Sequence, residues 1–229
     1  ATNVWVVEVA TATSFASLVQ SDTIEDLSFT LTGLNMKTKY YVRVKQLSER
    51  SADADVTNPS NVVEFETECG QLALNSVYDM EDYTAGTSYS VSYQPNCWGF
   101  NSGYSSYEPY VYNGNNGAYN HTAGGSKSMV LRGYNTTTPT LFTMPVASED
   151  VDMSMVTITF WAISSQYNGV DLKVGVMNSA EAYSSTAFKV AETVKVPNVM
   201  TKFTVRLDGL TDLTDAHKYI TFANATGNT

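Results

Sequence analysis

Hydrophobic and polar residues alternate along most of the chain, which is the period of a β-strand with one buried face. The alternating runs are rich in Val, Ile, Thr and aromatic residues, as half-buried strands require, and turn-like stretches separate them. No long segment has helical periodicity, so the pattern predicts an all-β protein built from β-sandwiches. The expected strands are residues 4–9, 29–34, 40–47, 62–68, 128–134, 155–163, 171–177, 187–196, 203–210 and 218–224.

The overall charge bears on the class of partner. The chain has 229 residues and a formal net charge of −10. A protein that follows nucleic-acid phosphates needs a basic face, and attraction to anionic lipid also needs basic residues. No apolar run approaches the roughly 20 residues of a membrane span. We therefore expect no nucleic-acid partner and no direct membrane insertion.

The most specific motif of the first part is LNMKTKYYVRV at residues 34–44. Tyr40 and the alternating strand that follows it resemble the tyrosine corner of fibronectin type III domains, with Met36 at the position that is usually proline. The segment PSNVVEFET at residues 59–67 is similar to the last strand of that family. We expect the Tyr40 hydroxyl to bond backbone groups at a corner of the sandwich, where they would otherwise be buried without partners.

This resemblance covers about residues 4–68, and we assign residues 1–68 to a fibronectin type III-like domain. A complete domain of this family has about seven strands and roughly 90–100 residues. The chain opens near what would be the third strand. We therefore expect a partial sandwich whose opening strands lie upstream, leaving an exposed edge or a gap filled by another segment.

Residues 69–229 form the second expected domain. In order along the chain come YDMEDY at 78–83, PNCWGF at 95–100, GSKSMVL at 125–131 and ITFWA at 158–162. This order resembles the MAM-like jelly rolls of Bacteroidota surface proteins, including the cleaved-adhesin and choice-of-anchor families. The resemblance implies a jelly-roll β-sandwich that directly follows a fibronectin type III domain and whose last strand lies beyond the sequence.

The two resemblances imply a non-catalytic adhesion or binding module, at the outer-membrane cell surface or in the extracellular space. Its ligand would be a glycan or a surface protein, and other domains of the parent chain would accompany it. The alternatives are a carbohydrate-binding accessory domain of a secreted hydrolase and a structural spacer. No GxSxG, HExxH or phosphate-loop pattern occurs, and His121 and His217 stand in polar segments. We therefore predict no enzymatic activity.

Residues 95–120 are rich in Tyr, Asn and Ser and carry a single charged residue. Sugar rings stack on Tyr and Trp, and Asn and Ser bond sugar hydroxyls. The predicted ligand-binding residues are Tyr104, Tyr119 and Tyr134, which stand among Gly, Ser and Asn. Alternatively, the aromatic residues line the inside of a sandwich. This second interpretation is favoured for Trp98, since the resemblance implies a packed side chain at its position.

Glu81 and Asp82 open the second domain. In related jelly rolls an acidic residue at this point often helps to hold a structural calcium ion, which needs six to eight oxygen ligands. Calcium is the one cofactor that the resemblance suggests, with Glu81 and Asp82 as its candidate ligands. Alternatively, the two carboxylates lie in solvent at the end of a strand.

Cys69 and Cys97 are the only two cysteines. Their spacing does not match a metal or redox motif, and reduced core thiols are one interpretation. The resemblance implies export to an oxidising compartment. Related tandem modules also often carry one cysteine at the domain junction and another before the Trp. We therefore predict a Cys69–Cys97 disulfide.

Overall fold

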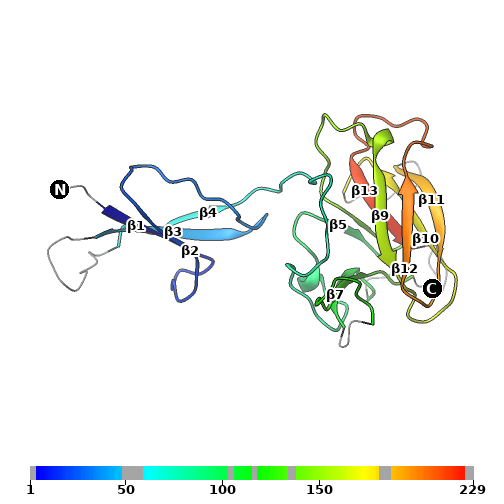
Figure 1. Cartoon of the computed structure of the whole chain (residues 1–229), viewed down its shortest axis with the longest axis horizontal. Helices are drawn as coiled ribbons and strands as arrows, with labels where there is room; N and C mark the ends of the chain where they lie inside the picture. Colours follow the sequence, from blue (N-terminus) through cyan, green and yellow to red (C-terminus); the bar gives the residue numbers. More distant parts are fainter. Residues whose placement is uncertain are drawn as a thin grey trace. The chain divides into compact units, whose positions relative to one another are not determined.

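The structure is a computed structural model that describes residues 4–47, 59–102, 106–114, 118–133, 138–180 and 187–224. The chain divides into two compact units, residues 1–69 and 70–229 (Figure 1). In the described ranges it forms thirteen strands and two single-turn 3-10 helices, η1 (Val91–Tyr93) and η2 (Met153–Met155). The prediction of an all-β protein is confirmed. No helix in these ranges is long and apolar enough to cross a membrane.

The described residues of the first unit form one antiparallel sheet with the strand order β2–β1–β3–β4. The strands are β1 (Val4–Ala10), β2 (Leu18–Ile24), β3 (Lys39–Leu47) and β4 (Val63–Glu66). Val7 lies opposite Val44, and Val9 opposite Val42, so these side chains share one face of the sheet. The small core of the unit forms on this face, around Val7, Val9 and Tyr40.

Tyr40 makes the corner contact that the sequence predicts. Its ring is 1% exposed and stacks on Phe65, with 5.8 Å between the ring centroids. Its hydroxyl accepts a hydrogen bond of 2.9 Å from the backbone N–H of Asn35. The bond satisfies a backbone donor at the turn into β3, as the tyrosine-corner interpretation requires.

The opposite face of this sheet carries a buried carboxylate, Glu8. Arg43 and Lys45, on the neighbouring strand, donate to its two oxygens at 2.5 and 2.7 Å. Burial raises the pKa of the Glu8 carboxyl, but the hydrogen bonds and charges of Lys45 and Arg43 outweigh it and hold the pKa below its ordinary value. The ion pairs thus compensate the cost of burying this charge.

The prediction of a strand at residues 29–34 is wrong. Phe29 and Leu31 do pack against the sheet, but no backbone hydrogen bond joins residues 29–34 to any other described residue. Next to this segment lies an open groove of about 310 Å³, lined by Trp5, Ile24, Leu27 and neighbouring apolar side chains. The side chains of residues 29–34 alternate as in a strand, but the backbone of this segment has no neighbouring strand with which to form hydrogen bonds in the described residues. The described part of the first unit is therefore one sheet with a partly uncovered apolar face.

In its described residues the second unit contains one large sheet and two strand pairs. The five-stranded antiparallel sheet has the order β11–β10–β13–β8–β5, and the pairs are β9–β12 and β6–β7. The large sheet comprises β5 (Gly99–Asn101), β8 (Leu141–Thr143), β10 (Val170–Met177), β11 (Phe188–Val196) and β13 (Tyr219–Asn224). The pairs comprise β6 (Tyr110–Asn113), β7 (Lys127–Val130), β9 (Thr157–Ala162) and β12 (Thr201–Arg206).

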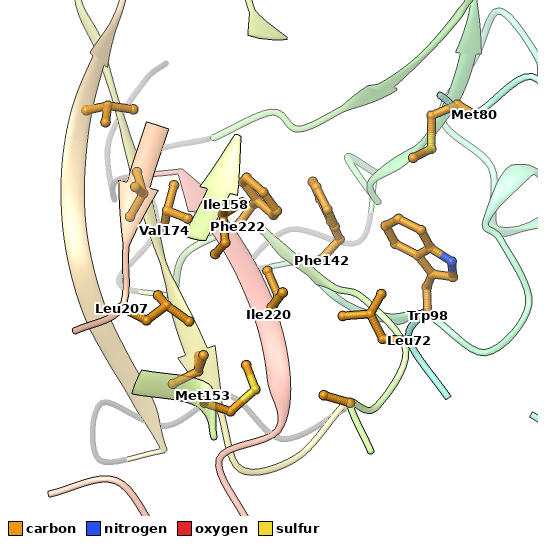
Figure 2. Packing of buried hydrophobic residues seen from close by; sticks show 14 of the residues in the cluster. Leu72, Met80, Trp98, Phe142, Met153, Ile158, Val174, Leu207, Ile220 and Phe222 are labelled. Carbon is orange, nitrogen blue, oxygen red and sulfur yellow. The ribbon is translucent and has the colours of Figure 1, made fainter. Parts of the chain in front are cut away.

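The core of the second unit gathers side chains from all three of these sheets. Val174 and Phe222 come from the large sheet, Ile158 and Val205 from the β9–β12 pair, and Val111 from β6. Figure 2 shows Trp98 beside Leu72 and Phe142 in this cluster. Trp98 is 8% exposed, so the packed interpretation of this residue is correct.

Cys69 and Cys97 are joined in a disulfide, as the resemblance implies. Cys97 lies in the turn that precedes Trp98, where the Trp98 N–H reaches the Pro95 carbonyl at 3.4 Å. The bond therefore attaches residue 69 to the turn that places the main aromatic side chain of the core.

Candidate functional site

Tyr119 is the one predicted ligand-binding residue within the described ranges, because Tyr104 and Tyr134 lie outside them. It is 38% exposed and lies on the loop between β6 and β7. Its ring contacts Tyr112 of β6, with 6.3 Å between the centroids and an interplanar angle of 64°. Tyr119 is therefore a surface aromatic residue supported by a second ring.

Tyr112 belongs to a row of tyrosines that continues into the protein. Its ring contacts Tyr110, and Tyr110 contacts Tyr89, with centroid distances of 6.3 and 5.1 Å. Tyr110 is 4% exposed, and burial, with smaller contributions from Tyr89 and Tyr112, raises its pKa to about 12. The Arg132 guanidinium lies 4.1 Å from the centroid of Tyr107 at the edge of this row. The row of tyrosines thus contains both a buried ring, Tyr110, and an exposed one, Tyr119.

The same loop carries His121, whose ring stacks on Trp161 of β9. The two rings lie 3.5 Å apart at an angle of 12°, and Trp161 remains 42% exposed. Our sequence prediction did not include this pair, because the two residues are far apart in the chain and Trp161 was assigned only to the expected strand at residues 155–163. The signal was available in the alternation: Trp161 shares the strand face of Thr157 and Thr159, opposite the buried Ile158.

Glu81 holds this loop in place. Its Oε1 accepts hydrogen bonds from the Asn120 side chain at 2.7 Å and from the N–H groups of Ser126 and Lys127, both at 2.9 Å. Burial raises the pKa of the Glu81 carboxyl. The three hydrogen bonds and the Lys127 charge lower this pKa by more than burial raises it, so the net shift is downward. Asn120 lies between Tyr119 and His121, so one carboxylate fixes the base of both aromatic contacts.

The surroundings of Glu81 do not favour calcium. Three N–H donors point at Oε1, and the Lys127 ammonium binds the carbonyls of Glu81 and Tyr83 at 2.5 and 2.7 Å. A cation at Oε1 would face these positive groups. Asp82 is exposed, and the described residues contain no cluster of three or more His, Cys, Asp or Glu side chains suited to a metal ion. The calcium ion stays a prediction.

The Glu81→Gln variant tests the role of this carboxylate through pH. The folded-state pKa of Glu81 lies below its unfolded value, so the unfolded chain binds more protons in acid. The stabilisation is complete above the unfolded pKa, roughly 4.3, and is lost as the pH falls through the folded pKa. We expect Glu81→Gln to destabilise at pH 7 and to approach the wild type at low pH, measured by urea unfolding.

Glu108→Gln is the matched control for this experiment. Burial raises the pKa of Glu108, and its hydrogen bond with Gln94 only partly offsets the shift. Ionisation of Glu108 therefore lowers the free energy of unfolding as the pH rises through the folded-state pKa of Glu108. This pH dependence is opposite in sign to that of Glu81. A gap between wild type and Glu81→Gln that did not shrink in acid would contradict the assigned role.

Comparisons of the chain with protein-family models, with curated proteins and with solved structures gave no match. The resemblance to fibronectin type III and MAM-like domains therefore stays a prediction. The geometry of the loop between β6 and β7 provides the evidence on function.

Proposed function

We propose that the chain is a non-catalytic binding module of an exported cell-surface protein and that its ligand is a glycan. The observation that carries the proposal is the pair of aromatic contacts made by the described part of the loop between β6 and β7: Tyr119 packs against Tyr112, and His121 stacks on the exposed Trp161. Exposed Tyr and Trp rings are suited to the apolar faces of sugars, and neighbouring Asn, Ser and Thr side chains can bond sugar hydroxyls.

The hydrogen bonds beneath the loop support this function energetically. Binding loses less free energy to ordering when the contact side chains are already held in position. Glu81 binds Asn120 and the backbone of Ser126 and Lys127, and the Asn120 side chain also accepts from the Thr122 N–H. The aromatic residues thus stand on a loop whose base is fixed.

The cellular setting is part of the proposal. The Cys69–Cys97 disulfide is compatible with an extracellular protein, because disulfides persist in oxidising compartments. The carbohydrate-binding accessory role in a secreted hydrolase uses the same surface and differs only in the parent chain. A structural spacer would need no ligand, so a binding experiment separates it from the proposal.

The test is glycan binding by wild type and three single variants, Trp161→Ala, Tyr119→Ala and Tyr167→Ala, on a glycan array and then by calorimetry. We expect the first two variants to bind at least about tenfold more weakly, a loss of about 1.4 kcal/mol. Tyr167 is 48% exposed on the loop between β9 and β10 and serves as the control, with unchanged binding. Absence of any glycan ligand, or equal effects of all three variants, would refute the proposal.

A further inference from the structure

The outer face of the β9–β12 pair is a continuous polar surface around Trp161. The side chains of the two strands alternate, and Ile158 and Val205 are buried in the core. The side chains on the opposite face are all exposed; they are Thr157, Thr159 and Trp161 of β9 and Lys202, Thr204 and Arg206 of β12. We call these six residues the β9–β12 face.

Lys202 lies directly opposite Trp161 in the antiparallel pair. Side chains in this relation have Cβ atoms about 4.5–5.5 Å apart, so one small ligand can contact both. No hydrogen bond or ion pair joins the Lys202 ammonium to another described residue. Arg206 differs, because its guanidinium pairs with Asp208 at 2.6 Å. Lys202 is therefore the cation of the face that is available to a ligand.

The charge of this face is opposite to that of the whole chain. The net charge is −10, yet β9 and β12 contain no Asp or Glu. A polyanion is repelled by most of such a protein and meets a local positive potential only at exposed cationic groups. The Oγ1 atoms of Thr159 and Thr204, 3.4 Å apart across the pair, add hydroxyl donors and acceptors beside Lys202.

Trp161 retains surface for a ligand although His121 covers one face of its ring. The indole is 42% exposed with the His121 ring in place. An apolar sugar face can therefore stack on the remaining exposed surface, while a group on the sugar edge reaches the neighbouring strand. The combination of a ring surface, hydroxyls and one free ammonium matches a sugar that carries a carboxylate.

We propose that the β9–β12 face selects an acidic glycan, in which a uronic acid ring lies on Trp161 and its carboxylate pairs with Lys202. The inference rests on the proposed glycan-binding function and names its ligand class. A charge-assisted hydrogen bond from an ammonium to a carboxylate is stronger than a neutral one. Because the pair lies at the surface, salt should weaken the binding.

The experiment compares polygalacturonate with the same polymer after reduction of its carboxyl groups, using calorimetry on the full chain. We expect wild type to bind polygalacturonate at least about tenfold more tightly than the reduced polymer. Lys202→Gln should remove most of this difference and the salt dependence. Lys189→Gln on β11 removes the same charge outside the face and should leave binding unchanged. Trp161→Ala should weaken the binding of both polymers.

The outcomes of this experiment distinguish the acidic-glycan specificity from the proposed glycan-binding function on which it rests. Equal binding of the two polymers, with Trp161→Ala still harmful and Lys202→Gln harmless, overturns the acidic specificity and leaves glycan binding intact. Equal losses in Lys202→Gln and Lys189→Gln also overturn it, since net charge alone would then explain the effect. Binding of neither polymer, together with no glycan ligand on the array, overturns both proposals.

Discussion

Replacement of both Cys69 and Cys97 by Ser is expected to lower the free energy of unfolding by about 3.5 kcal/mol, through the loss of a bond that closes a loop of about 28 residues. In the chain-entropy account the disulfide restricts the unfolded chain, so its loss favours unfolding. The bond holds the turn before Trp98, and Trp98 packs in the main core of the second unit. The measurement is urea unfolding monitored by tryptophan fluorescence.

Two controls isolate the bond from the side chains. Wild type unfolded in the presence of a reductant should lose the same stability as the double variant, and reductant should not affect the double variant. Either single variant leaves a free thiol, so the double variant avoids exchange chemistry. A double variant that unfolds within about 0.5 kcal/mol of wild type would show that the bond adds no stability.

Alternating and apolar runs were sufficient to predict the fold class, because strands such as β9 and β12 place buried and exposed side chains on opposite faces. The first unit shows the limit of this signal. β2 was not expected, since it lies at a sheet edge and most of its side chains are exposed, so it has little alternation to detect. Residues 29–34 do alternate, but a strand also needs a hydrogen-bonding neighbour, which sequence periodicity does not report.

The short strands of the second unit were missed for a different reason. β5, β6 and β8 have three or four residues each, which is too short for a period to emerge. Their pairing depends on distant partners, such as β5 with β8. The aromatic and Asn-rich sequence around β6 also reads as a loop, because Asn and Gly are typical of turns.

The candidate site was predicted only in part. Tyr119 was found because it is a Tyr among small polar residues. Trp161 and His121 were not, because their stacking depends on how the loop between β6 and β7 crosses β9. Glu81 was predicted as a candidate calcium ligand, whereas the structure shows its Oε1 accepting hydrogen bonds from the Asn120 side chain and from the N–H groups of Ser126 and Lys127. Composition identifies aromatic side chains, while the tertiary fold decides which of them remain exposed.

Trp98→Ala is expected to destabilise the second unit by about 3–5 kcal/mol, the usual cost of removing a large aromatic side chain from a core. Its ring contacts Tyr78, Tyr83 and Phe142 at centroid distances of 6.1, 5.9 and 5.7 Å. Its Nε1–H donates to the Tyr83 hydroxyl at 3.3 Å. The truncation would leave a cavity among these rings and remove the donor to that hydroxyl.

Trp161→Ala is the matched control, because it removes the same side chain from the surface of the same unit. It should cost about 1 kcal/mol or less, mainly through the lost contact with His121. The two variants should then have opposite profiles. Trp98→Ala lowers the urea midpoint strongly but binds glycan normally while folded, and Trp161→Ala lowers the midpoint only slightly but binds glycan weakly. Equal destabilisation by both variants would contradict the division of the aromatic residues into a core Trp98 and a binding Trp161.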